Sequence, residues 1–273
     1  MIDKTVWVVI PMYRHEDLTD ACVERTLECA GIPVKILVVD DCSDEPYKVK
    51  QSEGVHCLRL KERSGFTKAV NAGIRAVHGL FDYVVLLNND TVPEHDFIKS
   101  MVETAEKDAQ TGIVGASRIM SRIPYKVAMW GADLVTGSVA CSMEDLAEPC
   151  QAIWIPFCCV LLTKVCVQYV GLLDEQMVNH CSDNDYCLRA VMMHFGIVFD
   201  PNARVFHYLS QTVNELGITP YDDQIYFGRK WFGSAMNEIL DKIPINESLN
   251  KWGKCGFKYE KRERDLSESM VNE

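Results

Sequence analysis

Two clusters of acidic and amide side chains lie where apolar segments of the sequence end. Asp40 and Asp41 follow the run 34–39, and the stretch Asn88-Asn89-Asp90 follows the run 81–87. Carboxylate and amide oxygens bind divalent cations, which commonly hold the phosphate groups of a substrate. Either cluster alone is also typical of an ordinary turn, because Asn and Asp readily bond their own backbone.

The elements that must position these clusters alternate in character over the first 118 residues. Apolar runs or alternating patterns predict strands at 6–10, 34–39, 55–60, 81–87 and 112–116. Apolar residues at helical spacing predict helices at 18–30, 66–77 and 97–105. This alternation indicates parallel βαβ units. We therefore expect an open, doubly wound α/β half with a mostly parallel sheet and helices on both faces.

Ligands of open α/β sheets bind in the crevice beyond the carboxyl ends of the strands. Both polar clusters follow predicted strands, so they are expected to share one crevice. Two such clusters are less readily explained as independent turns than one would be.

The rest of the chain is less regular. Strands are expected at 154–162, 197–200 and 204–207, a helix at 183–195, and helical structure from 213 onward before a charged tail at 258–273. We predict an α/β half at 1–118, a second half of the same domain at 119–212, and a C-terminal helical extension at 213–273.

Composition limits the classes of protein that this chain could represent. The 273 residues are 48% hydrophobic and 25% charged, with a formal net charge of -11, which argues against a broad nucleic-acid-binding surface. The twelve cysteines form no Cys-x-x-Cys pair and are expected to be reduced. The start of the sequence lacks the pattern of a signal peptide, and the longest apolar run, 152–162, is too short to span a bilayer. We therefore expect no membrane span and a cytoplasmic location.

The usual glycine-rich phosphate loops are missing. The first predicted strand is followed by Pro11-Met12-Tyr13-Arg14-His15-Glu16, which contains no glycine, and Gly65-Phe66-Thr67-Lys68 lacks the spacing of a P-loop. A diphosphate would then be held by a divalent metal on a carboxylate.

An ordered set of motifs resembles a known family. The segments are Val9-Ile10-Pro11-Met12-Tyr13-Arg14, Val38-Val39-Asp40-Asp41, Ser64-Gly65-Phe66, Ala69-Val70-Asn71-Ala72-Gly73, Leu86-Leu87-Asn88-Asn89-Asp90-Thr91, Ser182-Asp183-Asn184-Asp185, Val205-Phe206-His207 and Tyr226-Phe227-Gly228-Arg229-Lys230-Trp231. Together they are similar to family-2 inverting glycosyltransferases, which adopt the GT-A fold. The resemblance covers roughly residues 5–232, and the Asn-Asn-Asp-Thr form is similar to rhamnosyltransferase-like members.

The resemblance implies that 1–118 is the nucleotide-sugar-binding half and 119–212 the acceptor-side half. It also implies roles for residues at the nucleotide end. Asp41 would contact the base and Asp40 would support it, while Pro11 and Tyr13 would flank the base. Each Asp is also an ordinary turn residue, and Pro11 also simply ends a strand. The other matching nucleotide-binding positions are Arg14, Gly65, Asn71, Asn88 and Asn89.

The resemblance also implies a Mn²⁺ or Mg²⁺ site. Asp90 occupies the last position of the family's Asp-x-Asp motif, whose first acid is replaced here by Asn88. His207 is a further candidate ligand, with a purely structural role as the alternative. Arg229 and Lys230 are candidate diphosphate contacts, although a solvated helix face explains them as well.

Asp183 matches the family's catalytic base, which removes the proton of the acceptor hydroxyl. The Glu that usually precedes it is Ser182 here, which removes a like charge that could have raised the pKa of Asp183. Asp183 could also cap the following helix, and Asp185 is the alternative base. We expect Arg189 to pair with these acids.

The function implied is metal-assisted, inverting transfer of a sugar from a UDP- or dTDP-linked donor to a hydroxyl of a glycan or glycoconjugate. Two other readings stay open, a sugar-phosphate nucleotidyltransferase and a catalytically inactive nucleotide-sugar-binding module on the same fold.

Overall fold

The computed structural model describes residues 4–50, 53–120, 127–129, 139–141, 148–208 and 221–232. The predicted charged tail at 258–273 and most of the predicted C-terminal extension lie outside these residues. The structure gives the backbone but not the side-chain environment of 118–120, 127–129, 139–141 and 232.

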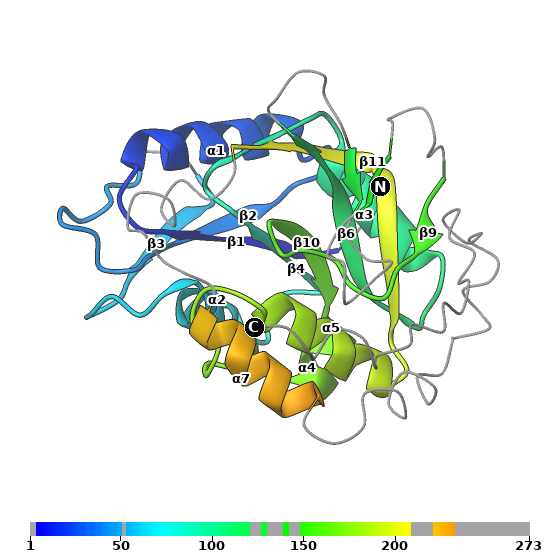
Figure 1. Ribbon diagram of the computed structural model, residues 1–273. Coiled ribbons are helices and arrows are strands. Elements are labelled where there is room, and N and C mark those ends of the chain that lie inside the picture. The colour runs from blue at the N-terminus through cyan, green and yellow to red at the C-terminus, as the bar shows by residue number, and fades with distance from the viewer. Residues whose placement is uncertain are drawn as a thin grey trace.

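One mixed sheet forms the centre of the molecule (Figure 1). Its main path runs β3-β2-β1-β4-β10-β6-β11-β5. These strands are β1 (Val6–Met12), β2 (Lys35–Asp40), β3 (Val55–Arg59), β4 (Tyr83–Leu87), β5 (Thr91–Pro93), β6 (Thr111–Met120), β10 (Cys159–Thr163) and β11 (Gly196–His207). Three short strands extend it: β7 (Val127–Met129) pairs with β6 and β8 (Val139–Cys141), and β9 (Cys150–Gln151) pairs with β11.

Helices cover both faces of the sheet. The buried residues of α1 (Glu16–Cys29) and α3 (Phe97–Glu106) pack in one core cluster, and those of α2 (Phe66–Ala76), α4 (Lys164–Val170) and α5 (Ser182–Met192) pack in the other. Figure 1 shows α1 on the opposite side of the sheet from α2, α4 and α5. Successive residues of β1 alternate between the clusters, with Val8 in one and Val9 in the other. This explains the continuous apolar run, since both faces of the strand are buried.

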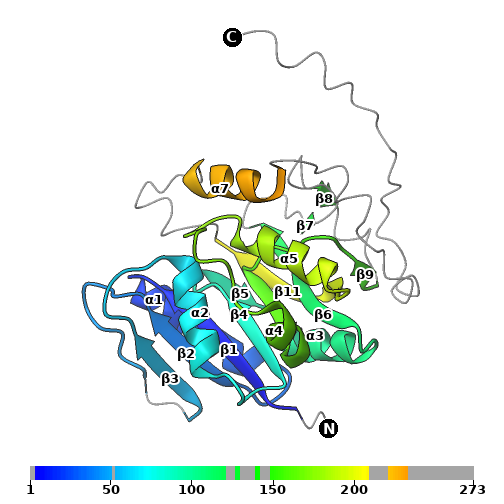
Figure 2. The same ribbon diagram turned by 90° about the horizontal axis from the view of Figure 1, so that it is seen from below.

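The final described helix, α7 (Tyr221–Phe232), lies outside these two layers (Figure 2). Its Phe227 packs with Met177 and with Leu188 of α5. Helix α7 therefore rests on the same side of the molecule as α5. No helix in the described ranges is long and apolar enough to cross a membrane.

The predicted α/β class with a mostly parallel sheet is confirmed. Strands β3, β2, β1 and β4 are parallel to one another, and β11 is parallel to β6. Strand β10 runs antiparallel between β4 and β6. The sequence did not reveal this insertion, because an apolar pattern carries no information about strand direction.

Several local predictions were wrong. The strand expected at 154–162 occupies only Cys159–Thr163, because residues 154–158 form a loop that passes Pro156. The two strands expected at 197–200 and 204–207 form the single strand β11, which is irregular between Asp200 and Arg204. The short elements β5 and α4 were not predicted.

The prediction that every cysteine is reduced was also wrong. Nine cysteines of the described residues are free thiols, but Cys150 is disulfide-bonded. Most of the free thiols are buried, and burial raises the pKa of Cys22 to about 11 and that of Cys166 to about 12. Such thiols behave as small apolar residues of the core.

Candidate functional site

A cavity of about 480 Å³ collects most of the residues singled out from the sequence. The predicted site residues that line it are Pro11, Tyr13, Asp41, Gly65, Asn88, Asn89, Asp90, Asp183 and His207. They come from the carboxyl ends of β1, β2 and β4, from the end of β11, and from the start of α2 and α5. The expected shared crevice is therefore present.

Asp41 fixes one wall of the cavity. Its Oδ1 accepts hydrogen bonds from the backbone N–H of Ser64 at 2.7 Å and the hydroxyl of Ser64 at 2.8 Å, and its Oδ2 accepts one from the N–H of Gly65 at 2.8 Å. Burial raises the pKa of the Asp41 carboxyl, although these hydrogen bonds oppose the rise. The carboxylate thus holds the turn before α2 while lining the cavity.

Gly65 is required at this turn. Its φ of 87° lies in the left-handed region, and a Cβ there would lie 2.4 Å from Cγ1 of Val178. The backbone at Gly65 therefore approaches the 178–180 loop more closely than any side chain would allow.

Asp40 supports the neighbouring loop and does not line the cavity. It is fully buried, and it accepts hydrogen bonds from the N–H groups of Ser43 and Tyr47 and from the Arg59 guanidinium. Burial alone would raise the pKa of the Asp40 carboxyl, but these hydrogen bonds outweigh it and hold the pKa below its usual value. The geometry agrees with the supporting role that the sequence suggested.

Tyr13 lies between two guanidinium groups. Cζ of Arg63 is 4.6 Å from the centre of the Tyr13 ring, and Cζ of Arg14 is 5.1 Å from it. Arg14 does not line the cavity, because its side chain pairs with Asp44 at 2.9 Å. Arg63 does line the cavity, and it is the one Lys or Arg among the described lining residues. Arg63 was not predicted as a site residue, because it lies on an exposed loop just before the Ser64-Gly65 motif.

Asp90 and His207 meet just beyond the carboxyl end of β4. Nε2 of His207 lies 3.0 Å from Oδ1 of Asp90, and both residues are buried. The pairing of β5 with β11, which sets His207 opposite Thr91, brings them together. Nδ2 of Asn88 lies 3.4 Å from the same His207 nitrogen.

The residues at this end fit a divalent cation. Two buried polar atoms, Oδ1 of Asn88 and Nδ1 of His207, have no hydrogen-bond partner within the described part of the chain. The described residues contain no group of three or more potential ligands among His, Cys, Asp and Glu. One carboxylate and one imidazole match the pattern in which the phosphates of a substrate supply further ligands.

Asp183 lines the cavity from the first turn of α5. Burial raises the pKa of its carboxyl to about 6, although the N–H groups of Asn184 and Phe157 and the indole of Trp154 donate to it and oppose the rise. A carboxylate with this pKa is suited to accept a proton near neutral pH. The rise comes from desolvation, so it does not need the acid that Ser182 replaces.

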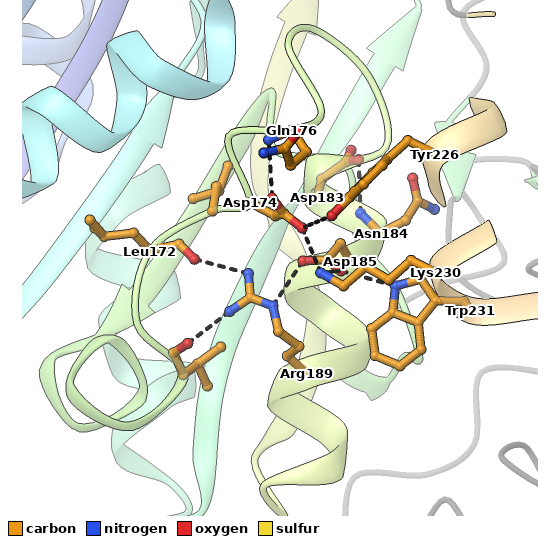
Figure 3. A network of polar contacts seen from close by, with 12 residues as sticks. Leu172, Asp174, Gln176, Asp183, Asn184, Asp185, Arg189, Tyr226, Lys230 and Trp231 are labelled. Atoms are coloured by element: carbon orange, nitrogen blue, oxygen red, sulfur yellow. Dashed lines mark hydrogen bonds and ion pairs between the residues drawn. The ribbon is translucent and has the colours of Figure 1, made fainter. Parts of the chain in front are cut away.

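Asp185 belongs to a structural network and is poorly placed as the alternative base. It is fully buried, does not line the cavity, and accepts from Arg189, Lys230 and Trp231 (Figure 3). The Arg189 Nε and Asp185 Oδ2 atoms are 2.8 Å apart, which confirms the expected pairing of Arg189 with these acids.

Three further candidates lie outside the cavity lining. Lys230 pairs with Asp174 at 2.7 Å and with Asp185 at 2.6 Å, so its ammonium is already neutralised away from the cavity. Arg229 is exposed on α7 and does not line the cavity. Asn71 is buried and bonds the backbone of Leu173 in both directions. The structure therefore disfavours diphosphate contacts by Lys230 and Arg229. It gives Asn71 a structural role, which is to bond the backbone of Leu173.

The 178–181 loop forms one wall of the cavity, and it was not predicted from the sequence. Asn179, His180 and Cys181 line the cavity, and Gln224 of α7 joins them. The Asp223 carboxylate of α7 accepts hydrogen bonds at 2.8 Å from the N–H groups of Val178, Asn179 and His180. This wall depends on a contact between distant segments, so no local pattern could have identified it.

Comparison with known proteins shows similarity to one family and to named relatives. Residues 7–126 match the model of the family described as Glycosyl transferase family 2. The chain is 26% identical over 216 residues to the poly-beta-1,6-N-acetyl-D-glucosamine synthase of Staphylococcus aureus (strain MSSA476), covering 76% of this chain and 51% of that protein. It is 32% identical over 111 residues to the succinoglycan biosynthesis protein ExoO of Rhizobium meliloti (strain 1021), covering 38% of this chain and 31% of that protein. The chain thus spans about half the length of the synthase.

Solved structures share the fold. A structure of GalNAc-T7 with UDP, GalNAc and Mn²⁺ matches 90% of this chain and 51% of its own, with a TM-score of 0.66 and 14% identity. The mannosyltransferase PcManGT from Pyrobaculum calidifontis, in complex with GDP-Man and Mn²⁺, matches 76% of this chain and 58% of its own, with a TM-score of 0.54 and 16% identity. S. aureus TarS 1–349 matches 89% of this chain and 77% of its own, with a TM-score of 0.52 and 14% identity. These likenesses confirm the expected GT-A type of fold.

Proposed function

We propose, from the match of residues 7–126 to the model of Glycosyl transferase family 2, that the protein transfers a sugar from a nucleoside diphosphate to an acceptor hydroxyl with inversion at the anomeric carbon. The observation that carries the proposal is that one cavity collects three acidic residues. Asp41, Asp90 and Asp183 all line it, although they follow or begin three different elements of the fold.

The nucleotide would bind where Tyr13, Asp41 and Arg63 surround one part of the cavity. Tyr13 offers an aromatic face for the base, and Oδ2 of Asp41 can accept a hydrogen bond from a base N–H. Arg63 adds a positive charge over the Tyr13 ring. The proposed donors are UDP- or dTDP-linked sugars, and the structures of GalNAc-T7 with UDP and of PcManGT with GDP-Man support a nucleotide-linked donor.

The diphosphate would lie at the Asp90–His207 end. When bound there, Mn²⁺ or Mg²⁺ supplies positive charge that stabilises the departing diphosphate. Asp90 and His207 would hold the ion, and Asn88 would orient the His207 ring, since its amide lies 3.4 Å from Nε2. The Mn²⁺ present in the GalNAc-T7 and PcManGT structures supports this choice of ion.

Asp183 would accept the proton of the attacking hydroxyl. Its pKa of about 6 leaves it ionised at neutral pH, and the donors from Asn184, Phe157 and Trp154 hold the carboxylate in place. Attack from the Asp183 side, with the leaving group held on the Asp90 side, inverts the anomeric centre. The acceptor is proposed to be a glycan or glycoconjugate, and the reaction is proposed to take place in the cytoplasm.

Calorimetry followed by a transfer assay tests this function. UDP, dTDP and GDP are titrated into the protein with Mn²⁺ and with EDTA, and at least one should bind more tightly with the metal. The corresponding nucleotide sugar should then release its nucleoside diphosphate, and more rapidly with an acceptor. Metal-dependent binding without turnover would indicate an inactive binding module, whereas formation of a nucleotide sugar from a nucleoside triphosphate and a sugar phosphate would indicate a nucleotidyltransferase.

A further inference from the structure

His180 carries a polar atom that the protein leaves unused. The residue lines the cavity, and its Nε2 is buried without a hydrogen-bond partner among the described residues. Leaving a buried polar group unpaired costs free energy, so such a group in a cavity wall calls for an explanation. A bound ligand is one explanation, because it would supply the missing hydrogen bond.

The backbone holds His180 firmly beside the start of α5. Its N–H donates to Oδ2 of Asp223 at 2.8 Å. The next residue, Cys181, has a φ of 61° and directly precedes α5, whose first turn carries Asp183. His180 and Asp183 therefore belong to one short segment that is anchored by α7 on one side and by α5 on the other.

The imidazole of His180 is suited to an uncharged partner. Burial lowers the pKa of His180, although the nearby Asp223 carboxylate opposes the change. A neutral imidazole has one N–H donor and one acceptor nitrogen, which complement a hydroxyl group.

The surrounding wall favours the same kind of ligand. Apart from Asp183, the cavity-lining residues of 179–184 and α7 are neutral: Asn179, His180, Cys181, Ser182, Asn184 and Gln224. The one Lys or Arg among the described lining residues, Arg63, lies over Tyr13 instead. Trp154 lines the cavity and donates to Asp183 through its indole N–H, so its ring lies close to the base. Phe157 also lines the cavity and donates to Asp183 through its backbone N–H. Neutral hydrogen-bonding groups beside aromatic rings match a sugar, which has hydroxyls at its edge and an apolar face of C–H groups.

We propose that His180 binds a second hydroxyl of a sugar acceptor, next to the hydroxyl that Asp183 deprotonates. This inference rests on the proposed function and adds the residue that orients the sugar ring of the acceptor beside Asp183. His180 would orient the ring, so that one hydroxyl reaches Asp183 while its neighbour bonds the imidazole.

The test uses the whole protein loaded with Mn²⁺ and whichever of UDP, dTDP or GDP binds best. Methyl glycosides of glucose, galactose, mannose, rhamnose and N-acetylglucosamine are titrated into wild type, His180→Phe and His180→Gln. The Phe variant keeps a ring but removes both nitrogens, and the Gln variant restores hydrogen-bonding groups. His78→Phe is the matched control, because His78 is exposed and does not line the cavity.

We expect at least one glycoside to bind wild type and His78→Phe alike. His180→Phe should bind it about three- to tenfold more weakly, which corresponds to one neutral hydrogen bond, and His180→Gln should recover part of the loss. Nucleotide affinity should be the same in all four proteins. Equal glycoside binding by His180→Phe, or no glycoside binding by any protein, would overturn the inference. Failure of every nucleotide to bind would instead overturn the proposed function.

Discussion

The imidazole Nε2 of His207 lies 3.0 Å from Oδ1 of Asp90, and the pairing of β5 with β11 holds both residues in place. The backbone N–H of Tyr208 also donates to the carbonyl of Asp90 at 3.0 Å. Two buried side chains from distant segments thus form one potential ligand pair. The pair offers an imidazole in a site where Asn88 replaces the first acid of the Asp-x-Asp pattern.

Asp90→Asn should abolish most of the dependence of nucleoside diphosphate binding on Mn²⁺. The substitution keeps the shape of the side chain but removes the negative charge. Removing a residue that only hydrogen-bonds to a metal ligand lowers metal affinity about 10- to 100-fold. Removing the ligand itself should therefore lower the affinity for Mn²⁺ at least about tenfold. His207→Ala should act in the same direction. Calorimetry with and without Mn²⁺ measures both effects.

Binding of the free nucleoside is the internal control for these two variants, since it should not change. Asp82→Asn is a matched control, because Asp82 accepts from Thr5 N–H at an exposed position outside the cavity. Unchanged Mn²⁺ dependence in both Asp90→Asn and His207→Ala would remove the metal from this end of the cavity.

Asp41→Asn should weaken the binding of nucleoside mono- and diphosphates to a similar extent. An amide group at this position would direct N–H donors at the Ser64 or Gly65 N–H groups, and it would remove a charged acceptor for the base. The loss of one charge-assisted hydrogen bond corresponds to about 1.5 to 3 kcal/mol. Asp44→Asn should have little effect, because Asp44 is exposed and pairs only with Arg14 among the described ion pairs. A loss confined to the diphosphate would move Asp41 to the metal end.

Arg63→Gln should lower nucleoside diphosphate affinity about three- to tenfold at low salt, and less at high salt. Arg63 is exposed and its guanidinium lies over Tyr13, so its contribution is that of a screened surface charge. Arg14→Gln is the matched control, because it contacts the same ring but is paired with Asp44 outside the cavity. Equal losses for the two variants would indicate a general effect of charge and not a contact with the nucleotide.

Much of the fold could be predicted because local patterns determine it. Strands β1 and β4 are apolar throughout, and β2 is apolar from Ile36 to Val39, since both faces of these segments are buried. The antiparallel direction of β10 could not be predicted, because it depends on which strands lie beside it. The same limitation explains why β5 was missed: its three residues are a strand only because β11 pairs with them.

The site, too, could be predicted only in part. Asp41, Asp90 and Asp183 stood in recognisable motifs, and the structure brings them to one cavity. Lys230 and Asp185 also stood in motifs, but they pair with each other outside the cavity lining. His180 was not predicted, because what marks it is a buried Nε2 atom without a hydrogen-bond partner among the described residues. That atom lies in a cavity wall held by Asp223 of α7, a contact between distant segments that sequence spacing does not reveal.

Asp185→Asn should destabilise the protein strongly. Asp185 is fully buried and accepts from Arg189, Lys230 and Trp231, so the variant leaves cationic groups poorly paired. Breaking a buried ion pair by removing one partner costs about 3–5 kcal/mol. Asp174→Asn should cost less, because Asp174 is partly exposed and pairs with Lys230 alone among the cations of the described residues. Denaturant unfolding measures both, and equal stabilities of Asp185→Asn and wild type would reopen a functional role for Asp185.

Asp183→Asn should leave nucleotide affinity nearly unchanged and reduce transfer by about 10²- to 10⁴-fold, the usual contribution of general acid–base catalysis. In the wild type, kcat/KM should rise as the pH passes through about 6, because the base must be ionised. The residual activity of the variant should lack this rise.

The stability of the same variant provides an independent check of the pKa. A carboxyl whose pKa is raised by burial binds more protons in the folded protein than in the unfolded chain between about pH 4 and 6. Wild-type stability should therefore fall as the pH rises through this range, and the neutral Asn should avoid that loss. Asp183→Asn should be more stable than wild type by about 1–3 kcal/mol at pH 7, with a smaller difference at pH 4. A variant that loses transfer but shows the same pH dependence of unfolding as wild type would contradict the assignment of a raised pKa to Asp183.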